Sequence, residues 1–253
     1  MPSLKTVVMV PKGAEYGAVC KGLARSRSSV RPLTERQATK FPEVVSLPVG
    51  PEPVRHFLRQ WSQQSTMQAS TPELHVIVMG LCGSLVSDLT VGDVVLYERC
   101  LNGETDLHEQ SERTPWVCST DIPLASNQVR ELSVRSVTGV MCDRILSTVA
   151  QKRQIGGQYQ AQVVDMEGIA VFQSVGEQAK KFSMVRVVSD DSSHDLPDLS
   201  AAFDPTGQIR PLSIAGQFLL QPAGAARLIR GSLIGLQALT KVAEGLATGL
   251  VQS

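Results

Sequence analysis

Two acidic side chains, each at the end of a predicted strand, are the residues best suited to chemistry. Glu167 lies in the motif DMEG, after a short strand predicted at residues 162–164, and Asp190 follows an apolar strand predicted at residues 184–188. Ligands of open α/β sheets bind outside the carboxyl ends of the strands. One carboxylate there can grip a sugar diol, while a second, protonated carboxyl group donates to a departing base. The pair is therefore suited to breaking an N-glycosidic bond.

Each of these acids also has a structural explanation. A carboxylate in the first turn of a helix, such as Glu167, is stabilised by the helix dipole without any function. Asp190 and the neighbouring Ser189 are residue types that cap helices, although a second acid, Asp191, follows directly. Glu15, just after the first predicted strand, could equally be an exposed residue of a first helical turn. Both interpretations of these acids stay open at this point.

The segment GLCGS at residues 80–84 follows an apolar strand predicted at residues 76–79. Glycine lets the backbone approach a ligand closely, so Gly80 and Gly83 suit a ligand-binding loop. Backbone N–H groups in such a loop can also form a concave anion site. Two glycines alone fit an ordinary tight turn equally well.

The sequence carries no pattern of metal ligands or of a hydrolytic triad. The five cysteines are scattered without a CxxC pair, which favours a reduced, cytoplasmic protein over a disulfide scaffold or a zinc site. His56 and His75 have no Cys or acid at the spacing of metal ligands. His194 is expected to be a solvated histidine in a loop. A Ser–His–Asp order with a nucleophile elbow is missing. We therefore expect neither a metal nor an organic cofactor.

Strand and helix patterns alternate along the chain. We expect strands at residues 6–10, 44–49, 76–79, 94–97, 137–141, 162–164 and 184–188, and helices at residues 15–23, 52–63 and 167–180. Residues 24–43, rich in Arg, Ser and Thr, are predicted to be irregular surface. This alternation predicts a three-layer α/β/α fold with a mostly parallel, doubly wound mixed sheet, formed by residues 1–253 as a single domain.

Composition excludes several classes of partner. Hydrophobic residues make up 42% of the 253 residues and charged residues 19%, as in a protein with a sizeable core. The formal net charge is zero, so nucleic-acid binding has no electrostatic support. The apolar run near the N-terminus is too short for a signal peptide, and no segment offers eighteen unbroken apolar residues. We expect a cytoplasmic protein without a transmembrane segment.

The segment at residues 211–250 is apolar, has helical spacing and contains one acid, Glu244. We expect one or two helices, broken near Pro222, that cover an edge of the sheet. Arg227, Arg230 and Lys241 give this segment a basic character. The alternative is therefore weak contact with a membrane surface through an amphipathic face.

These motifs together resemble one known family. The chain is similar to the superfamily of purine nucleoside phosphorylases and methylthioadenosine/S-adenosylhomocysteine nucleosidases, most clearly at residues 76–100 and 163–195. The segment GLCGSL…LTVGDVV resembles the glycine loop and following strand of that family, VDMEGIAV resembles its Met-Glu motif, and VRVVSDD resembles its Arg-x-x-Ser-Asp motif. The resemblance implies a nucleoside substrate and a homo-oligomer.

The resemblance also implies roles for individual residues. Met166 would pack on the ribose, and Glu167 would accept hydrogen bonds from its hydroxyls. Asp190 would protonate the purine at N7. Glu15 falls where the nucleosidases carry the carboxylate that activates water. Ile145, in the segment CDRIL, would line the base pocket.

Two departures from the family pattern leave the nucleophile open. Leu81 stands where known members place a serine or threonine, and the usual glycine-rich segment after the early strands is shortened to VGPEP. Phosphate would be the nucleophile if Gly13, the amides of residues 80–84 and a basic residue such as Lys12 or Arg55 form an anion site. Water would be the nucleophile if Glu15 acts as the base.

The apolar Leu81 and the long C-terminal segment look most like the hopanoid-associated phosphorylase branch, whose implied substrate is an adenosylated triterpenoid lipid. A rival hypothesis is a catalytically silent module that binds a nucleoside or a lipid on the same fold. The loss of the loop hydroxyl at Leu81 favours the silent module. The retention of Glu167 and Asp190 favours the enzyme.

Overall fold

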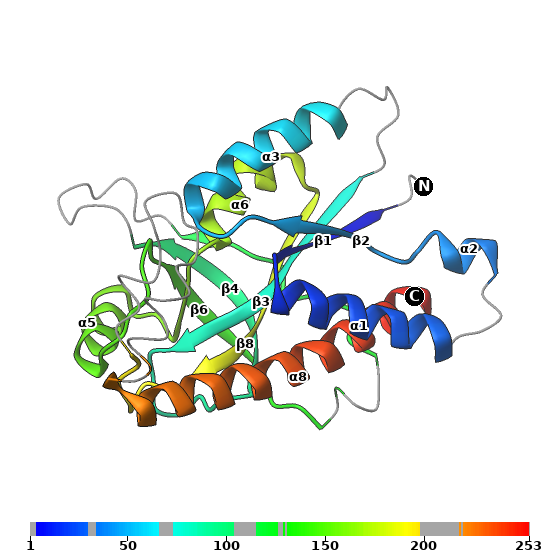
Figure 1. Ribbon diagram of the computed structural model, residues 1–253. Helices are drawn as coiled ribbons and strands as arrows, with labels where there is room; N and C mark the ends of the chain where they lie inside the picture. The colour runs from blue at the N-terminus through cyan, green and yellow to red at the C-terminus, as the bar shows by residue number, and fades with distance from the viewer. Residues whose placement is uncertain are drawn as a thin grey trace.

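A mixed sheet lies between two layers of helices in the computed structural model, with α1 and α8 on one face and α3 and α6 on the other (Figure 1). The structure describes residues 4–29, 34–65, 73–103, 115–125, 129, 131–197, 218 and 220–252. The strands are β1 (Lys5–Pro11), β2 (Glu43–Leu47), β3 (Leu74–Ser84), β4 (Val94–Asn102), β5 (Trp116–Val117), β6 (Val134–Met141), β7 (Val163–Asp165) and β8 (Lys181–Asp190). The helices are α1 (Ala14–Ser29), α2 (Glu35–Ala38), α3 (Pro51–Ser65), α5 (Val149–Tyr159), α6 (Gly168–Val175), the short 3-10 helix η2 (Gly176–Gln178) and α8 (Pro222–Gln252). The expected mixed α/β fold with a mostly parallel sheet is confirmed.

Strand pairing closes part of the sheet on itself. β3 pairs in parallel with β8, β8 pairs antiparallel with β4, and β4 continues in parallel to β6 and β6 to β7. β7 then returns to β3 as an antiparallel neighbour of Gly83 and Ser84, while β1 pairs with the first half of β3 and extends the sheet to β2. This arrangement brings the carboxyl ends of β3 and β8 next to β7.

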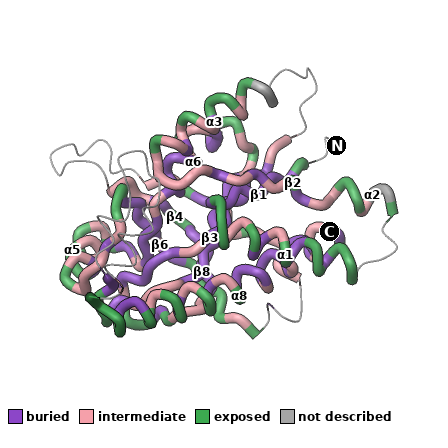
Figure 2. The backbone as a smooth tube through the Cα atoms, viewed as in Figure 1, coloured by how far each residue is buried: buried purple, intermediate pink, exposed green. Residues whose placement is uncertain are grey.

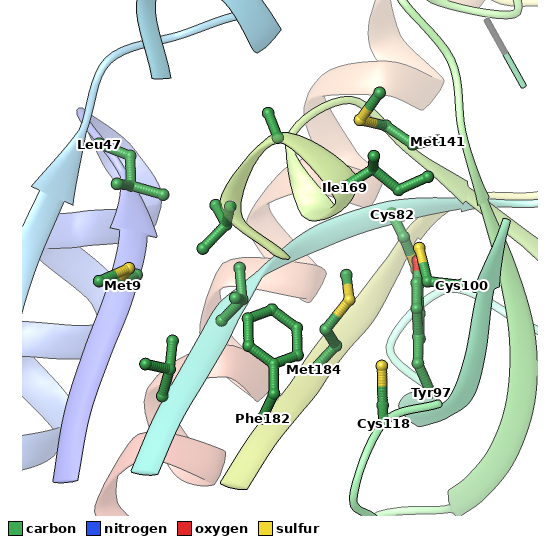
Figure 3. Packing of buried hydrophobic residues seen from close by; sticks show 14 of the residues in the cluster. Met9, Leu47, Cys82, Tyr97, Cys100, Cys118, Met141, Ile169, Phe182 and Met184 are labelled. Atoms are coloured by element: carbon green, nitrogen blue, oxygen red, sulfur yellow. The ribbon is translucent and has the colours of Figure 1, made fainter. Parts of the chain in front are cut away.

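The central strands are buried on both faces, as the purple tube in Figure 2 shows. One apolar cluster joins the sheet to α3 and α6, and a second joins it to α1 and α8. In Figure 3 the Tyr97 ring lies beside Cys100, within the cluster that also holds Ile169 of α6. Full burial on both faces explains why these strands appear as continuous apolar runs in the sequence.

Helix α8 packs very close to the end of β8. It begins at Pro222, whose fixed backbone angle and missing N–H suit the first position of a helix. A Cβ atom at Gly231 would lie 2.1 Å from the carbonyl oxygen of Ser189, and one at Gly235 would lie 2.9 Å from Leu81. The absence of these side chains therefore lets α8 contact the strand ends that carry the candidate site. Within the described residues, no helix combines the length and apolar character needed to cross a membrane.

Of three expectations about local structure, two were wrong and one was confirmed. The irregular surface expected at residues 24–43 includes the end of α1 and all of α2. The reason is tertiary: Ser26 of α1 is fully buried and its hydroxyl lies 3.0 Å from that of Thr248 in α8, so a polar residue is part of a packed face. The glycine loop expected at residues 80–84 is the end of β3, because its ladder with β8 continues through Gly80, Leu81 and Cys82. The break expected near Pro222 is confirmed, because residues 218 and 220 are helical, Gln221 is not, and α8 starts at Pro222; residues 211–217 and 219 lie outside the described residues.

We expect Gly231→Ala to destabilise the protein by about 1–3 kcal/mol, because the added methyl group would collide with backbone that cannot rotate away. Urea unfolding measures this change. Gly17→Ala in α1 is the matched control, since nothing lies within 4 Å of its Cβ position. The control should gain about 0.5–1 kcal/mol from helix propensity. Equal effects of both substitutions would show that α8 is not tightly packed at Gly231.

Candidate active site

The side chain of Arg186, on β8, is the centre of the candidate site. It is completely buried, and its Nη2 atom lies 3.4 Å from Oδ1 of Asp165. Among the described residues, none of its three guanidinium nitrogens has a hydrogen-bond partner of good geometry. Buried donors are almost always satisfied, so free donors at this position indicate a place for water or a polar ligand.

Three carboxylates from different chain segments surround this cation. Glu15 comes from the start of α1, Asp165 from the end of β7, and Glu167 from the junction between β7 and α6. All three interact electrostatically with Arg186. The Oε1 atom of Glu15 also accepts a 2.6 Å hydrogen bond from the backbone N–H of Leu81. Glu15 is therefore not the exposed helix residue of the structural alternative.

Asp165, and not Glu167, caps the start of α6 with its side chain. Its Oδ1 atom accepts hydrogen bonds from the N–H groups of Glu167 at 3.1 Å and of Gly168 at 2.7 Å, where α6 begins. The Glu167 carboxylate makes no capping bond and instead accepts one from the backbone of Gly50 in the loop before α3. Glu167 is thus a buried carboxylate that the helix does not need, which favours a functional role.

The burial of these acids makes them easier to protonate. Burial raises the pKa of Glu167 to about 7; Arg186 opposes this shift, while Glu15 and Asp165 add to it. Burial also raises the pKa of Glu15, against the Leu81 N–H and Arg186, which both favour the charged form. The pKa of Arg186 is lowered by burial but raised on balance by its acidic neighbours, Asp165 foremost, so the guanidinium stays charged.

Asp190, the last residue of β8, lies beside a second buried cation. Its Oδ2 atom pairs with the ammonium of Lys152 from α5, and the Lys152 side chain is 1% exposed. Burial raises the pKa of Asp190, and Lys152 is the main opposing influence. The adjacent Asp191 accepts hydrogen bonds from the backbone of Ser193 and from His194 instead. Of the two successive acids, Asp191 therefore supports a loop and Asp190 does not cap a helix.

The glycines of β3 border both groups. A Cβ atom at Gly80 would lie 2.3 Å from Nη1 of Arg186 and 2.7 Å from Oε1 of Glu15. Gly83 lies opposite Asp190 in the β3–β8 ladder. The side chain of Leu81 packs with the cluster of α1 and α8, so at this residue the backbone, not the side chain, contacts Glu15.

The other predicted residues have less defined surroundings. Met166 and Ile145 are half-buried, and the Ser189 hydroxyl lies 3.2 Å from the Cys82 carbonyl oxygen and 3.3 Å from Oδ1 of Asp190. Their contacts with substrate stay predictions.

The two basic residues considered for a phosphate site differ. Lys12 is exposed, whereas Arg55 pairs with Glu52 at 2.5 Å and contacts Gln173.

A pocket of about 340 Å³ adjoins the end of β8 on the side of α8. Asp190 and Ser189 line it, together with Thr90, Val91, Asp191, His194, Leu196, Arg227, Arg230, Gly231 and Ile234. Asp190, whose side chain is 13% exposed, therefore borders this pocket.

Sequence reasoning missed Arg186, Asp165 and Lys152 as members of the site. An arginine inside the apolar run VRVV was a usable signal, because a charge in a strand buried on both faces needs buried partners. Asp165 was visible only as part of the DMEG motif. Lys152 gave no signal, because a lysine on a helix is normally solvated.

The raised pKa of Glu167 predicts a pH-dependent cost of folding. Between pH 4.5 and about 7 the folded protein binds a proton that the unfolded chain releases, so stability falls as pH rises through this window. Glu167→Gln cannot titrate. We therefore expect its stability relative to wild type to increase by about 2–3 kcal/mol from pH 4 to pH 8. Urea unfolding at a series of pH values measures the difference. A difference that does not change with pH would mean that Glu167 is not buried as described.

Comparison with known proteins agrees with this architecture. Residues 71–219, more than half of the chain, match the Phosphorylase superfamily. No curated protein sequence matches the chain.

Solved structures give similar folds at low sequence identity. The 5′-methylthioadenosine/S-adenosyl homocysteine nucleosidase of Campylobacter jejuni has a TM-score of 0.59 and 14% identity, covering 96% of this chain and 99% of its own. A putative nucleosidase of the same type from Borrelia burgdorferi, bound to adenine, has a TM-score of 0.62 and 12% identity, covering 95% and 98%. The futalosine hydrolase of Helicobacter pylori has a TM-score of 0.59 and 15% identity, covering 94% and 97%. On the evidence of the family match, the chain belongs to the Phosphorylase superfamily.

Proposed function

We propose that the protein hydrolyses the N-glycosidic bond of an adenine nucleoside. The observation that carries the proposal is the gathering of Glu15 and Glu167 around the buried Arg186, with Asp190 four residues further along the same strand. Several solved proteins of similar fold are named as 5′-methylthioadenosine/S-adenosyl homocysteine nucleosidases, and a structure named as a putative one is bound to adenine. The likeness to these proteins supports the class of reaction, and the surroundings of each residue support its role.

Each acid has surroundings that suit a separate role. Glu167, held by the Gly50 N–H, would accept hydrogen bonds from the ribose hydroxyls and favour the positive charge that develops on the sugar. Asp190 would donate a proton to N7 of the purine as the bond between C1′ and N9 breaks and its electron pair moves onto the base. Burial keeps a carboxyl group protonated to higher pH, as a general acid requires.

Water is the nucleophile that the surroundings favour. Glu15 and the unsatisfied N–H groups of Arg186 offer both acceptor and donors to one water molecule, which is what a buried water needs. Its oxygen would bond to C1′ while its proton passes to Glu15. Phosphate has less support, because Arg55 is engaged by Glu52 and Lys12 is exposed.

A hydrophobic 5′ substituent, such as a hopanoid lipid, is the finer part of the proposal. The first half of α8 lines the pocket beside Asp190 with Arg227 and Arg230, and it exposes Ile229 at 48% and Leu233 at 56%. Glu244 is the only acid in α8 and lies in its second half. Ile234, 37% exposed, lines the pocket itself and suits a lipid-bearing substrate, whereas Ile229 and Leu233 lie on the outer side of the helix, where they suit weak contact with a membrane surface that delivers it.

The proposal predicts release of free adenine from adenosine, methylthioadenosine or a long-alkyl 5′ derivative of adenosine, without phosphate. Activity should rise with the length of the alkyl chain, because each buried methylene contributes about 0.8 kcal/mol. Chromatography of the base measures the release. If activity falls steadily as the chain lengthens, the lipid substituent is wrong and a small nucleoside remains. If no derivative releases adenine but one of them binds, the silent binding module is the better account.

Asp190→Asn should lower kcat by about 10²–10⁴-fold, because the side chain keeps its shape and loses its proton. The matched control is Asp191→Asn, which changes the neighbouring acid that supports the loop and should retain activity. Since Asp190→Asn leaves the Lys152 ammonium without its carboxylate, Asp190→Asn combined with Lys152→Met restores charge balance and should also be inactive. Folded Asp190→Asn protein with wild-type turnover would contradict the role of Asp190.

A further inference from the structure

The surroundings of Lys152 are more specific than an ordinary ion pair requires. Its side chain is 1% exposed, although it comes from α5, on the flank of the sheet. The ammonium contacts Oδ2 of Asp190 and donates a 2.5 Å hydrogen bond to the carbonyl oxygen of Asp191. Burying a lysine ammonium costs free energy unless the charge is paired, and here the pairing groups are at the end of β8.

The two oxygens of the Asp190 carboxyl group are held differently. Oδ2 is fixed by the Lys152 ammonium. Among the described residues, Oδ1 has one hydrogen-bond partner, the Ser189 hydroxyl at 3.3 Å, and that hydroxyl has a second acceptor, the Cys82 carbonyl, at 3.2 Å. Because a hydroxyl has one hydrogen to donate, Oδ1 is the oxygen that is free to exchange a proton.

We propose that Lys152 is a positioning residue for Asp190, holding Oδ2 so that Oδ1 faces the departing purine. The inference rests on the proposed function and adds to it a residue on a different element. Lys152 does not touch the substrate in this account. It acts only through the orientation and the charge of Asp190.

The charge of Lys152 also sets the pH range in which Asp190 can donate. Burial raises the pKa of Asp190 and Lys152 opposes it, so removing the ammonium should raise that pKa further. Other charged groups near Asp190 are Asp191, with His194 paired to it, and the pocket residues Arg227 and Arg230 of α8. None of these groups forms a described ion pair with Asp190. A substitution of Lys152 is therefore the one that tests the effect of a paired charge on the Asp190 pKa.

The test compares Lys152→Met with Lys152→Arg, which keeps the charge. In Lys152→Met the alkaline limb of the kcat/KM profile should move up by about one pH unit or more, because an opposite charge lowers a carboxyl pKa by about 1–3. Its kcat should fall, because Oδ2 is no longer held. In Lys152→Arg the limb should stay near that of wild type. A limb that moves equally in both variants, or in neither, would overturn the inference and leave Lys152 as a structural residue.

A second measurement separates this inference from the proposed function. The ¹³C carboxyl signal of Asp190 can be titrated in wild type and in Lys152→Met without any substrate. A higher Asp190 pKa in the variant supports the inference even if no nucleoside is cleaved, and an unchanged pKa overturns it even if the enzyme is active. Lys181→Met is the control, since Lys181 pairs with Asp121 at the opposite end of β8 and should alter neither readout.

Discussion

The buried charge of Arg186 is the constraint on which the rest of the site depends. Removing a guanidinium from water costs several kcal/mol unless acids and hydrogen bonds compensate. Here the compensating carboxylates come from the start of α1 and from the junction of β7 with α6, so one cation fixes both segments against β8. The same cation explains Gly80, because a side chain there would occupy the space of the guanidinium and of Glu15.

The acids of the site differ because their neighbours differ. Glu167 is buried beside two other acids and one shared arginine, and its pKa lies at about 7. Asp190 is buried beside a lysine of its own, which limits how far burial raises its pKa. Carboxyl groups whose surroundings give them different pKa values are suited to different steps of one reaction. In the proposed hydrolysis, Glu15 accepts a proton, Glu167 holds the sugar and Asp190 gives a proton to the base.

The sequence predicted those parts of the site that are local. Glu167 and Asp190 stand out because short motifs place acids at strand ends, and the apolar runs before them correspond to β7 and β8. Glu15 could be predicted by its position after β1, but its contact with the Leu81 amide joins segments 66 residues apart. Such contacts depend on the closed pairing of β3, β8 and β7, which periodicity within one strand cannot reveal. Lys152 and the buried Ser26 were missed for the same reason: each is a polar residue whose burial is decided by a distant element.

The most direct test of the account is a crystal structure of the protein with adenine bound. The account predicts that N7 of the base lies within hydrogen-bond distance of Oδ1 of Asp190, with Oδ2 still paired to Lys152. It also predicts that N9 points toward the carboxylates of Glu167 and Glu15, where the sugar would be. Adenine bound away from Asp190, or with N9 directed away from the Arg186 group, would contradict the central claim that these acids act on one N-glycosidic bond.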